Sequence, residues 1–402
     1  MHKPLEGVKI LDLTWVYSGP YATLLLQDLG AEIVKVEMPG VGDKTRYFPP
    51  LKNQESGYFY MLNRDKKSIA LDLKKHEDQQ VFKQLVKNFD VVVENFLPGT
   101  MDKMNIGYDS LKMENASLIY ASISGFGSFG PYAQFPCIDP IAQALGGLMS
   151  LTGEKGGTPQ KTGPGITDGI SGIYLALGIV SALYQRMGSG EGQQIEVSML
   201  ESTVSVLEDA VIRASMTRET LETKGNTDPF GAPWDAFKTK DNKWVMVCAL
   251  GSKQFETCFR LIGREDLAEE FAGETEDAYE KRSQQLERLN TVFGKWVIQQ
   301  TAQQTMDILQ KEGILIGDVK TVNDLLIDPH LIERKMISTL KHDALGTIQV
   351  ANSPILFNGQ RYCSTTKEHV VSSKIGEHTE EILQQYLGDT IINRKDKEMV
   401  EE

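Results

Sequence analysis

The start of the chain carries a strand, a helix and a second strand in close succession. The apolar run 8–13 predicts a strand, and Pro20 suits the first position of a following helix. Leucines at helical spacing occupy 21–29, Gly30 is a natural helix stop, and 32–37 predicts the second strand. Two strands joined by a helix within about thirty residues form a βαβ unit, which requires a parallel sheet.

The alternation of strands and helices continues along the N-terminal half. Further strands are expected at 68–73, 90–94, 118–124 and 193–199, and further helices at 77–87, 169–187 and 200–214. The economical fold for this pattern is α/β, with a Rossmann-like, doubly wound parallel sheet.

The composition of the chain changes near residue 225, which indicates a boundary between two domains. Gly, Asn, Asp and Pro cluster over 223–231, which is typical of a linker. The segment 234–248 predicts a hairpin with Asp241 and Asn242 at its turn. The expected division is a large domain at 1–224 and 326–402, and a smaller α+β domain at 225–325.

Charge and cysteine content narrow the classes of function. The chain has 402 residues and a formal net charge of −13, which repels nucleic acid and anionic membrane surfaces. Its four cysteines are far apart, which favours a reduced, cytoplasmic location over a disulfide framework. The histidines lack metal-ligand spacing, and no uninterrupted apolar run reaches the length of a membrane span. We therefore expect no metal, no nucleic acid and no membrane partner.

The turn after the first strand argues against a dinucleotide cofactor. Residues 15–20 hold one glycine and a proline, where NAD binding requires Gly-x-Gly-x-x-Gly. Glu37 stands where a ribose-binding acid would lie, but a pyrophosphate cannot approach this backbone as the fingerprint allows. NAD is not expected.

Asp168 is the candidate with the most chemistry around it. It lies directly before an apolar, nearly uncharged helix and within the glycine-rich stretch 162–172. An aspartate in that place is commonly an N-cap for free backbone N–H groups. It is also a carboxylate that burial would desolvate beside N–H donors, which suits a nucleophile. Its position alone favours the N-cap, with the nucleophile as the alternative.

Glycine loops and scattered cations supply further candidates. Gly125, Phe126 and Gly127 follow a predicted strand and are typical of an active-site lid, although a plain connection explains them equally well. The segment around Gly251 is a weaker copy of the same pattern. The cations near the strand ends, which together could hold a phosphorylated ligand, are Lys35, Arg46, Lys66, Lys67, Lys74 and Lys103.

Five stretches together resemble the class III CoA-transferases, the group of formyl-CoA transferase and crotonobetainyl-CoA transferase. They are Leu11–Leu13 with Gly19 and Pro20; Gly30–Glu37 with Gly40, Gly42 and Asp43; Val93–Gly99; Thr167 with Asp168; and Gly190–Gln193. Asp328–Pro329 and Gly376–Thr379 add support. The order and spacing of these stretches extend the resemblance over nearly the whole chain.

The resemblance implies a fold, a reaction and a set of site residues. The family forms interlocked homodimers and uses an aspartate, here matched by Asp168, as its nucleophile. It moves coenzyme A from an acyl-CoA to a carboxylic acid, such as oxalate or succinate, through a mixed anhydride and an aspartyl-CoA thioester. CoA thioesters are its substrates, and no permanently bound cofactor is expected. The family's CoA-contacting positions match Val16, Tyr17, Met38, Leu71, Lys74, Asn95, Phe96, Lys103 and Met104.

Departures from the pattern bear on the substrate and on the related α-methylacyl-CoA racemases. Formyl-CoA transferases have glutamine at Tyr17, arginine at Met38 and tyrosine at Ile138. The histidine and glutamate of the racemases fall on Ile138 and near Ser252, and neither residue can accept a proton. The resemblance therefore favours transfer of CoA, with a racemase-like isomerase as the alternative.

Overall fold

Two compact units make up the protein. The computed structural model describes residues 2–228, 231–362 and 373–388. The first unit is built from described residues within 1–149, 161–219 and 329–402, and the second from those within 150–160 and 220–328. The segment 150–160, expected in the large domain, belongs with the second unit. Gly225 N–H donates to the Gly153 carbonyl (2.9 Å) and the Thr223 hydroxyl to the Glu154 carbonyl (2.7 Å), which ties this segment to the 220s.

Six parallel strands form the central sheet of the first unit, in the order β5-β2-β1-β6-β7-β8. Their bounds are Lys9–Asp12 (β1), Glu32–Glu37 (β2), Lys67–Ala70 (β5), Val91–Glu94 (β6), Ile119–Ser124 (β7) and Gln194–Ser198 (β8). The chain moves outward from β1 to β5, returns to β6 on the other side of β1, and moves outward again. This order confirms the predicted doubly wound parallel sheet, whose direction reverses between β1 and β6.

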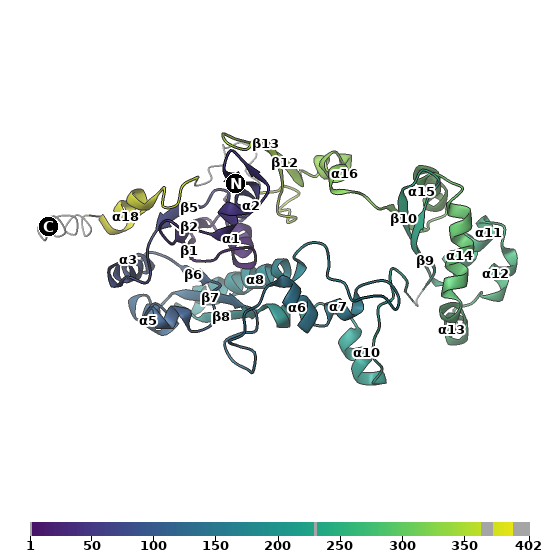
Figure 1. Ribbon diagram of the computed structural model, residues 1–402, viewed down its shortest axis with the longest axis horizontal. Helices are drawn as coiled ribbons and strands as arrows, with labels where there is room; N and C mark the ends of the chain where they lie inside the picture. Colours follow the sequence, from purple (N-terminus) through teal and green to yellow (C-terminus); the bar gives the residue numbers. More distant parts are fainter. Residues whose placement is uncertain (1, 229–230, 363–372, 389–402) are drawn as a thin grey trace, which may run out of the picture. The chain divides into compact units, whose positions relative to one another are not determined.

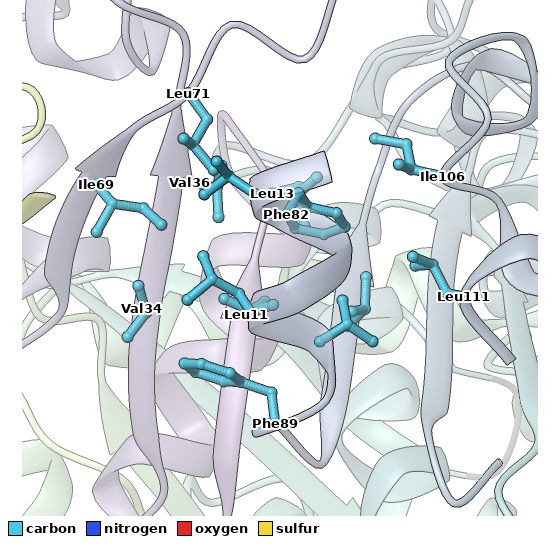
Figure 2. Packing of buried hydrophobic residues seen from close by; sticks show 14 of the residues in the cluster. Leu11, Leu13, Val34, Val36, Ile69, Leu71, Phe82, Phe89, Ile106 and Leu111 are labelled. Carbon is cyan, nitrogen blue, oxygen red and sulfur yellow. The ribbon is translucent and has the colours of Figure 1, made fainter. Parts of the chain in front are cut away.

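Helices cover both faces of this sheet, because its strands are apolar on both sides. Leu11 and Val92 point to one face, where Phe82 packs against the sheet (Figure 2). Their neighbours Ile10 and Val91 point to the other. The helices are α3 (His76–Val86), α5 (Tyr108–Glu114) and α18 (Thr379–Leu387) on the first face, and α1 (Ser18–Asp28) and α8 (Ile166–Ser189) on the second (Figure 1).

Shorter elements complete the first unit. They are η1 (Lys44–Tyr47), β3 (Leu51–Lys52), β4 (Glu55–Ser56), α2 (Gly57–Asn63), α4 (Thr100–Lys103), α6 (Asp139–Leu145), α9 (Met199–Val204), α10 (Ala210–Thr217), α17 (Pro329–Glu333), β12 (Ile337–His342) and β13 (Gly346–Ala351), with α7 (Leu148–Leu151) at its border along the sequence. The single helix predicted over 200–214 is wrong. Glu208 has a φ of 55°, which a right-handed helix does not tolerate, and the chain forms α9 and α10 instead.

The second unit contains a three-stranded antiparallel sheet and a phenylalanine-rich core. Its elements are β9 (Gly231–Lys238), β10 (Trp244–Leu250), α11 (Gly251–Leu261), α12 (Glu265–Glu270), α13 (Glu276–Gln284), α14 (Leu286–Val297), α15 (Ala302–Lys311), β11 (Leu315–Asp318) and α16 (Val322–Leu326). Strands β9 and β10 confirm the predicted hairpin, and Asn242 at its turn has a φ of 60°. Phe255, Phe259 and Phe293 lie in the core that the helices form against the sheet.

Helix α8 is the longest element of the first unit and is unusually apolar. By length and composition alone it could cross a membrane, although its sequence has no uninterrupted apolar run of that length. A core helix of a globular domain passes the same test, and Leu175 and Ile179 of α8 are fully buried in the core beneath the sheet. Its opposite side is exposed at Ile173, Leu177 and Tyr184.

Candidate active site

The fold brings most predicted site residues of the first unit to one edge of the sheet. Val16 and Tyr17 follow β1, Met38 follows β2, Leu71 and Lys74 follow β5, Asn95 and Phe96 follow β6, and Gly125, Phe126 and Gly127 follow β7. Neighbouring parallel strands end at the same edge, so these residues share it. The reversal of strand order between β1 and β6 lies in the middle of that edge, where α/β sheets bind ligands.

The predicted CoA-binding residues differ in what their side chains offer. Lys74 and Lys103 are exposed, and their ammonium groups can meet phosphate oxygens. The ring of Phe96 packs against that of Trp15, with centroids 6.2 Å apart. Leu71 is only 4% exposed within the hydrophobic core (Figure 2), so only its backbone can contact a ligand.

Three other predicted CoA contacts lie at different depths. Met38 is exposed directly after β2, and Met104 caps the C-terminus of α4 while packing partly against the core. The side-chain amide of Asn95 hydrogen-bonds to the protein's own backbone. Its Oδ1 accepts from the Trp15 N–H (3.0 Å) and its Nδ2 donates to the Trp15 carbonyl (2.7 Å).

Three of the cations expected to hold phosphate are instead buried in ion pairs. The pairs are Lys66 with Asp12 (3.0 Å), Lys35 with Asp43 (3.1 Å) and Arg46 with Glu37 (2.6 Å). A fourth cation, Lys67, faces Glu381 at 2.8 Å. Carboxylates therefore already engage these four cations, which leaves Lys74 and Lys103 as the exposed candidates for phosphate among the six.

Asp168 lies in the first turn of α8 and does not cap it. The N-cap position is Gly165, and Asp139 of α6 supplies the capping carboxylate from another part of the chain. Asp139 Oδ2 accepts from the backbone N–H groups of Thr167 (2.8 Å) and Asp168 (3.2 Å). The N-cap interpretation of Asp168 is wrong, since Asp139 has that role and leaves the Asp168 carboxylate available.

The Asp168 carboxylate faces the N-terminus of a second helix. Ser18, the first residue of α1, presents its hydroxyl and its backbone N–H to the carboxylate, and both act to lower the pKa of Asp168. Gly172 allows α1 and α8 to meet closely, because a Cβ there would lie 2.6 Å from the Ser18 carbonyl oxygen. Two helix N-termini therefore converge on one carboxylate, and both favour negative charge there.

Burial nevertheless makes that charge costly. Desolvation, and then the nearby Asp139 carboxylate, raise the pKa of Asp168 to about 7, while the Ser18 hydrogen bonds act in the opposite direction. No lysine or arginine among the described residues contributes to this pKa. A carboxylate with a raised pKa is a stronger nucleophile than an ordinary one, and with a pKa of about 7 about half of it is ionised at neutral pH.

Aromatic rings and a thiol surround the carboxylate. Tyr17 packs against Gly165 and Gly169, and a Cβ at Gly169 would lie 3.6 Å from the Tyr17 hydroxyl. The Tyr17 and Tyr58 rings meet edge to face at 6.5 Å. Burial and neighbouring groups including Asp168 raise the pKa of Tyr17 to about 12, so its phenol stays a hydrogen-bond donor.

The two glycine segments differ in their setting. Gly127 has a φ of 81° and its N–H donates to the Ser124 hydroxyl (3.0 Å), so this turn after β7 is held in place. A Cβ at Gly125 would lie 2.1 Å from the Cys137 Cβ, which explains the glycine by close packing. Gly251 begins α11 in the second unit, where its φ of 75° favours glycine.

A polar pocket of about 200 Å³ opens over the ends of β6, β7 and β8, on the face opposite α8. Glu94 lies in its wall, 8% exposed, and accepts from the Phe96 N–H (2.8 Å) and the Tyr120 hydroxyl (3.4 Å). Burial raises the pKa of Glu94 to about 7. The pocket borders the segment that carries Asn95 and Phe96.

Sequence reasoning missed four residues that surround Asp168. They are Ser18, Tyr58, Cys137 and Asp139. Burial, and then the charge of Asp168, raise the pKa of Cys137 to about 11. Of the four, only Asp139 has a recognisable signal in the sequence, because it stands directly before a proline at the start of a helix.

Comparison with known proteins agrees with this geometry. The sequence profile described as CoA-transferase family III matches residues 5–370. The chain is 37% identical to a succinyl-CoA:mesaconate CoA-transferase of Haloarcula hispanica (87% of this chain, 89% of that one). It is 35% identical to an acetyl-CoA:oxalate CoA-transferase of Acetobacter aceti (89% and 90%).

A solved structure shares the fold throughout. It is the crystal structure of a CAIB/BAIF family protein from Brucella suis, with a TM-score of 0.83 and 31% identity over 96% of this chain and 100% of that one. Together with the profile match over most of the sequence, this likeness leads to one conclusion: the chain belongs to CoA-transferase family III and is an enzyme that transfers coenzyme A.

Proposed function

We propose that the protein moves CoA from an acyl-CoA to a carboxylic acid through covalent intermediates on Asp168. The carboxylate attacks the thioester carbonyl, the carbon–sulfur bond breaks, and a mixed anhydride and CoA thiolate result. The thiolate then attacks the Asp168 carbonyl, which releases the donor's acid and leaves an aspartyl-CoA thioester. The acceptor carboxylate attacks this thioester, which expels CoA thiolate and forms a second mixed anhydride. The thiolate then attacks the acceptor's carbonyl in that anhydride, which gives the new acyl-CoA and restores the Asp168 carboxylate.

The observation that carries this proposal is a half-buried carboxylate that faces the N-terminus of α1 and has a raised pKa, with no lysine or arginine acting on it among the residues that the structure describes. The Ser18 N–H and hydroxyl orient the attacking oxygen. The same donors, with the Tyr17 phenol, can stabilise an oxyanion that forms on the neighbouring carbonyl. Asp139 holds the first turn of α8 through two backbone N–H groups, which fixes the nucleophile.

CoA would lie across the edge of the sheet where the strand order reverses. The exposed ammonium groups of Lys74 and Lys103 can pair with its phosphates, and the Trp15 and Phe96 rings offer an aromatic surface nearby. The acceptor is a small acid or dicarboxylate. The acceptors named for two relatives, mesaconate and oxalate, are the first to test.

A homodimer would explain the exposed apolar side of α8. Ile173, Leu177 and Tyr184 are 51%, 59% and 79% exposed, and Met187 is 85% exposed. Side chains of this size rarely form a water-facing stripe on a monomer, so a second copy is the expected cover. We propose the interlocked homodimer that the family resemblance implies. A cytoplasmic location fits Cys137, Cys248 and Cys258, which are free thiols.

Mass spectrometry of the intact protein tests the covalent chemistry. The protein is incubated with acetyl-, succinyl- or formyl-CoA, trapped with hydroxylamine or borohydride, and digested to locate the modified residue. We expect modification at Asp168 with at least one donor, and none in Asp168→Asn. Transfer activity without any adduct at Asp168, or full activity of Asp168→Asn, would contradict the proposal.

An isomerase remains the second candidate because it shares the CoA site. Racemisation needs a base at the α-carbon, but Ile138 is an aliphatic side chain and the Ser252 hydroxyl donates to Glu256 (2.9 Å). The matched experiment supplies an α-branched acyl-CoA in deuterated water without any acceptor acid. Incorporation of deuterium at the α-carbon would favour isomerisation over transfer.

A further inference from the structure

Val16 stands in a conformation that its side chain disfavours. Its φ is 69°, in the left-handed region, where a β-branched residue is a clear outlier. Such a residue persists only when its surroundings hold it there, and outliers of this kind concentrate at functional sites. Val16 also lies directly between β1 and α1, at the reversal of strand order.

Three side chains hold the backbone from Thr14 to the N–H group of Val16. Lys35 Nζ donates to the Thr14 carbonyl (2.6 Å), and Asn95 bonds to both the N–H and the carbonyl of Trp15. Asp43 Oδ1 accepts from the Val16 N–H itself (3.2 Å). The backbone of three consecutive residues is therefore bound to side chains that come from outside the turn.

These three side chains are themselves fixed. Lys35 and Asp43 are 1% and 2% exposed and form an ion pair of 3.1 Å. Asp43 Oδ1 also accepts from the Thr45 N–H (2.9 Å) and the Thr45 hydroxyl (2.8 Å). Asn95 follows directly on β6, whose Val93 carbonyl accepts from the Leu13 N–H (2.8 Å). The turn is thus anchored to two strands of the sheet.

The next two residues of the chain are those that face Asp168. Tyr17 packs against Gly165 and Gly169 at the N-terminus of α8, and Ser18 presents its hydroxyl and N–H to the carboxylate. A change of φ at Val16 would swing both residues as a unit, because α1 begins at Ser18. The conformation of one residue therefore sets how the N-terminus of α1 meets the nucleophile.

We propose that Asn95 is a positioning residue, which together with Lys35 and Asp43 imposes the left-handed conformation of Val16 and so presents Tyr17 and Ser18 to Asp168. This inference rests on the proposed nucleophilic role of Asp168. It also reassigns Asn95, whose match to a CoA-contacting position implies a direct contact with CoA. Here its amide is engaged with the Trp15 backbone on both sides.

A double-mutant cycle between Asn95→Ala and Val16→Gly tests the proposal in the full-length enzyme. Without the Asn95 amide, a valine gains by leaving the left-handed region, whereas glycine occupies that region at no cost. We expect Asn95→Ala to lower kcat at least tenfold (about 1.4 kcal/mol). In the Val16→Gly background the loss should be smaller by about fivefold or more, because the strain is already relieved there.

The pH–rate profile separates positioning from binding. In Asn95→Ala, Tyr17 and Ser18 move away together, and loss of the Ser18 contacts should move the acidic limb of kcat to higher pH, while Asp139, Tyr58 and Cys137 still face the carboxylate. A CoA contact would instead raise KM for the acyl-CoA and leave the limb in place. A rise in KM alone, or equal losses in both Val16 backgrounds, would overturn the proposal.

The second unit offers a matched control. Asn290 makes the same pair of bonds to a tryptophan backbone, accepting from the Trp234 N–H (3.0 Å) and donating to its carbonyl (3.0 Å). Asn290→Ala should leave the acidic limb unchanged.

If wild type transfers no CoA, the proposed function fails. The turn is then tested alone by hydrogen exchange of peptide 13–18, which should speed up in Asn95→Ala and slow again with Val16→Gly; no change would overturn the proposal.

Discussion

Two regions of the first unit bury carboxylates in opposite ways. At the ends of β1 and β2, Asp12, Glu37 and Asp43 each have a cationic partner within about 3 Å. At the N-terminus of α8, Asp168 and Asp139 lie together, and no lysine or arginine among the described residues acts on Asp168. Both regions border the same edge of the sheet.

The pKa values record this difference. Although burial opposes it, Lys66 and Lys35 lower the pKa of Asp12 to about 2. Burial and the Asp139 charge raise the pKa of Asp168 to about 7. In the paired region the charged groups hold the backbone in place, including the turn at Val16. In the unpaired region burial destabilises the ionised carboxylate, and forming a covalent bond would remove that destabilisation. This is the pattern expected of a nucleophile.

Removing the unpaired carboxylate should have the largest effect on activity. Asp168→Asn keeps the shape and the hydrogen bonds to Ser18 but cannot form an anhydride. We expect kcat for CoA transfer to fall by about a thousandfold or more, a loss typical of a missing nucleophile. Steady-state CoA transfer with the donor and acceptor that the wild type uses measures it. A loss below tenfold would show that Asp168 has no covalent role.

Breaking the paired region should act on stability instead. Lys66→Met leaves Asp12 buried without its cation, which typically costs about 3–5 kcal/mol of unfolding free energy. Urea denaturation followed by circular dichroism measures the loss. The control is the neighbouring Lys67→Met, whose partly exposed pair with Glu381 should contribute less than about 1 kcal/mol. Equal effects of the two changes would contradict the contrast between buried and exposed pairs.

Asp168→Asn should also stabilise the fold, opposite in sign to Lys66→Met. The pKa of Asp168 is raised from 3.8 to about 7 on folding, so the native state holds its proton longer. Stability is therefore lost as pH rises through this interval, and the asparagine avoids that loss. We expect no gain at pH 4 and about 1–2 kcal/mol above pH 7, allowing for solvent screening. An equal gain at both pH values would contradict this assignment.

The hydrophobic pattern was sufficient for the parallel sheet, because β1, β2, β5, β6 and β7 are short apolar runs separated by helices. The hydrophobic pattern could not identify the buried ion pairs, since lysines such as Lys35 and Lys66 are usually found on the surface. Their partners become neighbours only when separate strands align at one edge. Likewise Asp139 meets Asp168 through a contact 29 residues apart, which no local pattern encodes.

The resemblance to a family, rather than any local pattern, pointed to Asp168 as the nucleophile. Position alone favoured an N-cap, and Asp139 turned out to hold that role. The family's CoA-contacting positions gathered at the sheet edge as the doubly wound order requires. The setting of Leu71 in the core and of Asn95 on the Trp15 backbone depended on packing that the sequence does not display.

The smallest expected effect is that of removing the Asp139 charge beside Asp168 in the unpaired region. Asp139→Asn keeps an acceptor for the Thr167 and Asp168 N–H groups but removes the charge that raises the pKa of Asp168. Because the carboxylate is the reactive form, the wild-type rate should fall as pH drops below about 7. In Asp139→Asn this limb should move to lower pH, so activity at pH 6 rises severalfold relative to pH 8. Profiles of kcat measure the shift, and a limb that stays in place would show that Asp139 acts on the α8 backbone alone and does not tune the nucleophile.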